Sequence, residues 1–149
     1  MLPNFQAYLT PIERMNLQRP IIALITLTLA VTCSSQLISQ STHGASRERG
    51  EKVYETYCTT CHLPTGKGIP GTFPPLAKAD YLINNRSDAI RAVKQGMEGE
   101  VTVNSMTYNN VMYSLGLDDQ QVVDVMNYIL NNWGNDGAEV TLEEVKAIN

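Results

Sequence analysis

The chain has 149 residues, of which 43% are hydrophobic and 17% charged, and its formal net charge is -4. This length favours one domain, because domains most often contain roughly 100–150 residues. The acidic balance lacks the basic bias of nucleic-acid binding proteins, so we expect no DNA or RNA partner.

Residues 1–33 have the pattern of a secretory or lipoprotein signal. Arg19 precedes the short apolar run "PIIALITLTLAVTC", which is too short for a membrane span of roughly 20 residues but typical of a signal sequence. Met15 is a second suitable start, which would make residues 1–14 an over-extended gene start. Lipidation of Cys33, which would tether the protein to a membrane, simple cleavage and an uncleaved anchor all remain open.

Residues 34–46 are rich in Ser, Thr and Gly and are interpreted as a flexible linker in which His43 is solvated. A first helix is predicted over 46–59, with Ser46 as its cap and Val53, Tyr54 and Tyr57 on one face. Gly50 would cost this helix roughly 1 kcal/mol relative to alanine. It indicates either a close approach by another helix or a later helix start.

The segment "CTTCH" begins at Cys58 and includes Cys61 and His62. Structural zinc would need four ligands, and after these three residues only His43 is available. A thioredoxin-like dithiol would need a strand before the cysteine pair and a β-α pattern around it, whereas this pair follows a predicted helix. Covalent haem attachment needs only the pattern present, Cys-x-x-Cys-His. We therefore predict thioether bonds from both cysteines to one haem c and iron ligation by His62.

The remaining elements are mainly helical. We predict a helical turn over 78–82, a helix over 87–95 that begins at a Ser87 cap and stops at Gly96, and a small hairpin in "EVTVNSMTY". A strong amphipathic helix over 118–132 begins with the capping-box pair Asp118 and Gln121. The capping spacing recurs in "TLEEVKAIN", which predicts a short terminal helix.

An electron-carrying haem iron usually needs a second strong ligand, methionine or histidine. Met126 falls in the 118–132 helix, while Met97 and Met106 are interpreted as packing or surface residues. Met112 occupies the non-helical segment "YNNVMYSLGLDD", from which its side chain could be aimed across the haem. We predict Met112 as the second iron ligand.

Four blocks, "GEKVYETYCTTCH", "GKGIPGTFPPLAKADYL", "VTVNSMTYNNVM" and "VVDVMNYILNNWGN", resemble class I c-type cytochromes. The resemblance covers nearly all of Gly50 to Val145 and is strongest to small monohaem domains found alone or fused to copper nitrite reductases. It implies that residues 47–149 form an all-α cytochrome c fold, in which three to five helices surround the covalently attached haem, together with a small β-hairpin.

The resemblance also implies roles for individual residues. Gly50 and Tyr54 correspond to positions where the first helix crosses the last strong helix, near Val125 and Tyr128. The segment that contains Pro74 and Pro75 would supply the backbone carbonyl that accepts a hydrogen bond from His62, and Pro75 is taken as cofactor-binding. Met112 matches the methionine ligand of the family.

Two positions depart from the family's pattern. The family normally has proline after the ligand methionine, whereas this chain has Tyr113, and Ser105 stands where relatives often have glycine. Proline restricts the backbone. Its replacement by Tyr113 predicts a weaker or more exchangeable Met112 bond.

We expect an exported, periplasmic one-electron carrier that exchanges electrons with redox proteins and is not an enzyme. In one alternative, displacement of Met112 lets a small molecule bind or react at the iron. In another, the chain is a haem subunit of a larger oxidoreductase.

Overall fold

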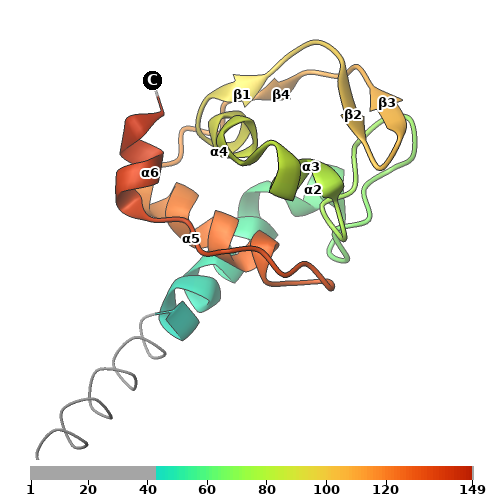
Figure 1. Cartoon of the computed structure of the whole chain (residues 1–149). Helices are drawn as coiled ribbons and strands as arrows, with labels where there is room; N and C mark the ends of the chain where they lie inside the picture. Colours follow the sequence, from blue (N-terminus) through green and yellow to red (C-terminus); the bar gives the residue numbers. More distant parts are fainter. Residues whose placement is uncertain (1–42, 149) are drawn as a thin grey trace, which may run out of the picture. The chain divides into compact units, whose positions relative to one another are not determined.

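The computed structural model describes residues 43–148 (Figure 1). The leader, Cys33 and most of the predicted linker lie outside this range. The described elements are the first helix, residues 43–57, followed by α2 Thr59–His62, α3 Asp80–Asn84, α4 Arg86–Gln95, β1 Gly96–Met97, β2 Val101–Val103, β3 Met106–Tyr108, β4 Met112–Tyr113, α5 Asp119–Leu130 and α6 Leu142–Ala147. The expectation of a mainly helical domain with a small hairpin is confirmed.

The first helix packs across α5 at Gly50, as predicted. A Cβ placed on Gly50 would collide with the backbone carbonyl of Asp124 and lie 2.9 Å from the Cβ of Tyr128. The Tyr54 ring is 5.5 Å from that of Tyr128, centre to centre, and 4.9 Å from that of Trp133. The expected neighbour Tyr128 is therefore present, but Asp124, rather than Val125, comes nearest to the glycine.

Ser46 does not cap the first helix, because the helix already includes residues 43–46. Its buried hydroxyl instead donates a 2.7 Å hydrogen bond to Oδ1 of Asp124 and accepts one from the Asn127 amide. His43 was expected to be solvated in the linker, but its Nδ1 lies 2.9 Å from a carboxylate oxygen of Glu139. Ser46 and His43 are thus held by residues distant in the sequence, which local sequence does not reveal.

The two helices before the hairpin, α3 and α4, begin at other residues than predicted. α3 spans Asp80–Asn84, so both its start and its end lie two residues later than in the predicted turn over 78–82. α4 begins at Arg86, so Ser87 lies inside the helix; its N-cap is Asn85, which makes no capping hydrogen bond through its side chain. The predicted stop at Gly96 is confirmed, with a φ of 84°.

The predicted hairpin forms between β2 and β3, with Val103 paired to Met106. Its two-residue turn has positive φ at both Asn104 and Ser105, 51° and 64°, the signature of a type I′ turn. Asn104 and Asp80 exchange hydrogen bonds between side chain and backbone, at 2.8 and 3.0 Å. The hairpin is therefore tied to the start of α3, and Ser105 fills the turn position expected for glycine.

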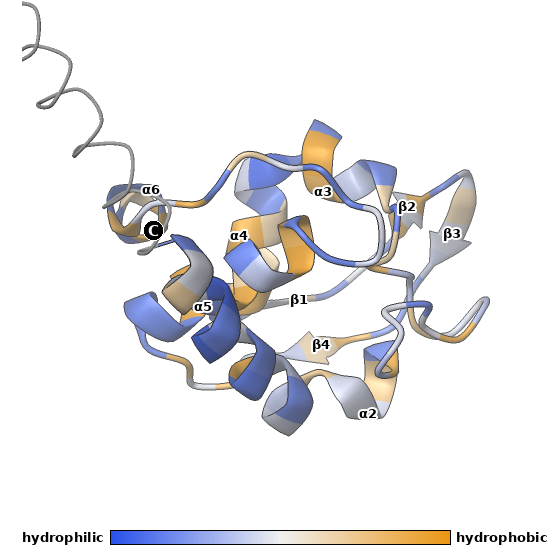
Figure 2. Ribbon diagram, turned by 90° about the horizontal axis from the view of Figure 1, so that it is seen from below, coloured by the Kyte–Doolittle hydropathy of each residue, from blue (hydrophilic) through white to orange (hydrophobic). Residues whose placement is uncertain are grey.

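Both capping boxes of the C-terminal region are confirmed, at Asp118–Gln121 before α5 and at Thr141–Glu144 before α6. α5 ends at Leu130, two residues before the predicted end. It supplies much of the core, with Val122, Val125, Met126 and Leu130 fully buried. The ribbon in Figure 2 shows hydrophobic and hydrophilic residues along both α4 and α5, as their amphipathic patterns require. Among the described residues, no helix is both long and apolar enough to cross a membrane.

Candidate cofactor site

The two cysteines and the histidine lie together on one helical turn. Cys58 follows the first helix and is the N-cap of α2, and its carbonyl accepts hydrogen bonds from the backbone N–H groups of Cys61 and His62, at 3.2 and 2.9 Å. Cys58 is buried and Cys61 half-buried. The hydroxyl of Tyr54 donates a 2.8 Å hydrogen bond to the carbonyl of Leu63, directly after α2. The first helix thereby holds the end of the turn that carries His62.

His62 is oriented by a backbone carbonyl. Its Nδ1 lies 3.0 Å from the carbonyl oxygen of Pro74, which can only accept, so Nδ1 carries the proton and Nε2 keeps its lone pair. Burial lowers the pKa of His62, and the bond to Pro74 opposes that shift. A neutral imidazole with a free Nε2 is the form that binds a metal. Of the two prolines considered from the sequence, Pro74 is the acceptor.

A tight backbone turn sets the position of Pro74. Gly68 has a φ of 61°, and its N–H donates to the His62 carbonyl at 3.0 Å. A Cβ on Gly68 would collide with the carbonyls of Phe73 and Pro74. The glycine therefore lets the histidine and proline segments approach closely enough for the Nδ1–carbonyl bond.

His62 faces an apolar cavity with an empty volume of about 630 Å³, part of it open to solvent. Its walls come from the α2 turn, α3, α4, α5 and the strands, and include Cys58, Pro74, Pro75, Leu76, Ala79, Tyr81, Leu82, Val93, Val101, Val103, Met126 and Ile129. A cavity of about 440 Å³ adjoins it and is lined by both His62 and Cys61. Pro75 thus contributes to the wall but not to the hydrogen bond.

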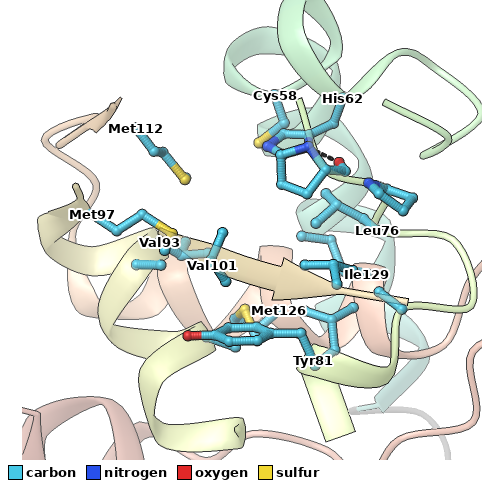
Figure 3. Close-up of a pocket in the computed structure, with 17 residues that line it drawn as sticks. Cys58, His62, Leu76, Tyr81, Val93, Met97, Val101, Met112, Met126 and Ile129 are labelled. Carbon is cyan, nitrogen blue, oxygen red and sulfur yellow. Dashed lines mark hydrogen bonds between the residues drawn. The ribbon is translucent and has the colours of Figure 1, made fainter. Parts of the chain in front are cut away.

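Met112 lines both cavities and lies across the open space from His62 and Cys58 (Figure 3). It belongs to β4, which pairs with β1 in a two-stranded antiparallel ribbon that was not predicted from the sequence. Met97 pairs directly with Met112 and lines the same two cavities. Its interpretation from the sequence as a packing or surface residue did not anticipate that it lies beside Met112 at the cavity wall. Met126 is fully buried in α5 and lines only the larger of these two cavities, whereas Met106 is 44% exposed.

These residues suit a large apolar cofactor with two covalent attachment points. Burial, reinforced by nearby Cys61, raises the pKa of the Cys58 thiol to about 11. A dithiol redox centre instead lowers the pKa of its attacking cysteine. Within residues 43–148, no group of three or more His, Cys, Asp or Glu side chains could hold a metal ion. Two thiols and an imidazole at the edge of an apolar cavity fit haem c.

The family model described as "Cytochrome c" matches residues 47–133. The chain belongs to the cytochrome c family. Cytochrome c-552 from Thermus thermophilus is 39% identical to this cytochrome over an alignment of 110 residues, which covers 66% of this chain and 82% of the relative. The expected class I c-type cytochrome fold is confirmed, and membership implies one covalently attached haem c with its iron.

More distant relatives are parts of dehydrogenases. The cytochrome c subunit of a quinone-dependent alcohol dehydrogenase from Gluconacetobacter polyoxogenes is 31% identical over 90 residues, 58% of this chain and 19% of the subunit. The cytochrome subunit of a fructose dehydrogenase from Gluconobacter japonicus is 26% identical over 124 residues, 77% of this chain and 24% of the subunit. The cytochrome spans about a fifth to a quarter of these subunits.

The family and these relatives support a monohaem electron carrier or a haem subunit of an oxidoreductase. The closer likeness to haem domains fused to copper nitrite reductases is tested by none of the relatives described above and stays a prediction.

Proposed function

We propose that this protein is an exported one-electron carrier whose haem is attached through Cys58 and Cys61 and whose iron is ligated by His62 and Met112. The observation that carries the proposal is the placement of Met112 across an apolar cavity from the free Nε2 side of an oriented His62. The haem supplies a change of one electron between ferrous and ferric iron.

The chain's own residues hold the ligands and exclude water. The Pro74 carbonyl fixes the His62 ring and increases its basicity as a ligand, as outer partners of metal-bound histidines do. The apolar walls, to which Pro75 contributes, keep water from the iron and disfavour the additional positive charge of the ferric state. Methionine as the second ligand raises the reduction potential further.

Electron exchange requires a partner at a surface close to the haem. Val111 and Tyr113 flank Met112 and are 50% and 78% exposed. An exposed apolar pair beside the ligand provides a small contact surface for transient docking of a redox protein. From residue 47 onward the chain has nine basic and fourteen acidic side chains, so a donor or acceptor with a basic face would be attracted to it.

The leader pattern supports export to the periplasm, where c-type haem is attached in the bacterial systems that this sequence resembles. Lipidation of Cys33 would tether the domain to the membrane, whereas simple cleavage would release it and an uncleaved anchor would retain the whole leader. The intact mass of the purified holoprotein separates the three. A pyridine haemochrome spectrum of the same sample tests haem c, and a mass without haem would refute covalent attachment.

The second ligand is tested in the holoprotein by methionine methyl NMR of the ferrous state, because the porphyrin ring current moves the methyl of a bound methionine far upfield. We expect one such signal in the wild type, absent at its wild-type position in Met112→Leu. The ferric wild type should also show the far-red band of a methionine–iron bond. A five-coordinate wild-type spectrum would contradict the carrier assignment.

Two alternatives have separate observations in their favour. The exposed Tyr113 in place of a restrictive proline favours exchange of Met112 for a small ligand such as nitric oxide, which titration with that gas would detect in the untreated protein. The likeness to dehydrogenase subunits favours permanent attachment to a larger oxidoreductase. Isolation from the native membrane as a stable complex would support the second alternative over a freely diffusing carrier.

A further inference from the structure

Two methionines, from two segments of the chain, stand side by side on one face of the β1–β4 ribbon. Met97 and Met112 are direct partners in the antiparallel register. Side chains directly opposite each other in such a pair project from the same face, with Cβ atoms about 4.5–5.5 Å apart. Figure 3 shows both side chains reaching into the cavity from the side opposite Cys58 and His62. The cavity therefore has two thioethers within reach of its centre.

The backbone enforces this juxtaposition. Gly96 ends α4 and pairs with Tyr113, and a Cβ on it would collide with the carbonyl of Met112 and lie 2.8 Å from the backbone nitrogen of Ser114. Its φ of 84° is one that glycine adopts without strain. Only glycine at this position lets the end of α4 lie so close to β4. Met97 follows directly, which fixes it beside Met112.

The other described methionines do not share this position. Met106 lines neither of the two adjoining cavities and is 44% exposed at the hairpin. Met126 is fully buried in α5, and Figure 3 shows it apart from Met112. Met97 and Met112, by contrast, line both adjoining cavities together with His62.

We propose that Met97 is a reserve iron ligand that binds in place of Met112 when the Met112 bond is broken. This inference rests on the proposed role of Met112. In the exchange one iron–sulfur bond breaks and another forms, no electron or proton is transferred, and the ligand set stays histidine and thioether. Methionine suits this role because its three rotatable side-chain bonds let the sulfur shift without large backbone movement.

The exchange would compensate for the presence of Tyr113 where the family normally has proline. A Met112 bond that is easily broken would otherwise leave the iron open to water or small ligands. With Met97 at the paired position, the iron keeps a thioether and the reduction potential stays in the range of methionine ligation. The site would thus tolerate loss of Met112 from the iron.

The test uses full-length holoprotein with ¹³C-methyl methionine, in four forms: wild type, Met112→Leu, Met97→Leu and the double variant. We expect Met112→Leu to keep the ferric far-red band and to show one upfield ferrous methyl signal at a new position. Met97→Leu should keep the wild-type signal, and the double variant should lose both band and signal. Leucine conserves volume, and far-UV circular dichroism verifies that each form is folded.

Matched controls place Met106→Leu and Met126→Leu in the Met112→Leu background. Neither should remove the new signal. Loss of band and signal in Met112→Leu alone would overturn the exchange while leaving the proposed function intact, provided that the wild type shows the signal of Met112. A wild-type signal that survives Met112→Leu unchanged would overturn both. Retention of the band in the double variant would overturn the role of Met97.

Discussion

The crossing of the first helix with α5 and the β1–β4 ribbon both depend on a glycine, yet the chain stabilises them to different degrees. At the crossing, Gly50 lies against the Asp124 backbone, and the Tyr54, Tyr128 and Trp133 rings pack together. At the ribbon, Gly96 lies against Met112 in a pairing of two residues on each strand. Two strands alone are marginally stable in water. The crossing therefore has extensive packing of its own, whereas the proposed iron–methionine bond would add to the stability of the ribbon.

The largest loss of stability is expected from a substitution at the crossing of the first helix with α5. Gly50→Ala forces a methyl group against the Asp124 carbonyl and should lower the free energy of unfolding by about 3 kcal/mol, the upper part of the range for overpacking. Gly44→Ala is a matched control in the same helix, because an added Cβ there meets nothing within 4 Å. It should leave stability unchanged or raise it by up to about 1 kcal/mol. Denaturant titration of the holoprotein measures both, and equal effects would contradict the close approach.

A smaller loss of stability is expected from a substitution in the β1–β4 ribbon. Gly96→Ala combines strain at a positive φ with a collision at Met112 and should cost about 2 kcal/mol of stability. It should also make imidazole displace the second iron ligand at several-fold lower concentration, measured by loss of the ferric far-red band. Gly99→Ala has the same sign of φ, 89°, but open space around the added Cβ. It should cost about 1 kcal/mol and leave the imidazole titration unchanged.

The smallest effect is expected at the Arg86–Glu144 ion pair, which contacts neither the crossing nor the ribbon. Hydrogen bonding to Arg86 lowers the pKa of Glu144 below its usual value. The ionised Glu144 therefore stabilises the fold at pH values above that usual pKa, and this contribution is lost as the pH falls through the lowered pKa of the folded state. The glutamate side chain is 40% exposed, which limits the effect to about 1 kcal/mol or less.

Glu144→Gln keeps a side chain that can complete the capping box while removing the titration. The wild type should lose its stability advantage over this variant as the pH falls below about 4.5. Unfolding curves of the two proteins between neutral and acidic pH test this difference. An advantage that grows on acidification would contradict the assignment to Glu144.

Most helices, the hairpin and the cysteine–histidine turn of the site could be predicted from patterns of residues close in sequence. The Asp118–Gln121 and Thr141–Glu144 capping boxes, the stop at Gly96 and the hairpin were all recognisable, because each depends on hydrogen bonds or backbone preferences within a few residues. Ser46 and Ser87 were wrongly assigned as caps for the same reason. Their sequence neighbourhood suits a cap, but Ser46 lies inside the first helix with its hydroxyl bonded to distant Asp124, and α4 begins one residue before Ser87.

The cysteine–histidine turn was predictable from the sequence, because Cys58, Cys61 and His62 lie within five successive residues of one helical turn and need no distant residue to come together. The choice of Pro74 over Pro75 as the histidine's partner was decided only by the tertiary structure, through the Gly68 turn. The pairing of Met97 with Met112 was decided there too. These two residues are far apart in the chain, and no local pattern specifies which of two short extended segments will pair once the helices have packed.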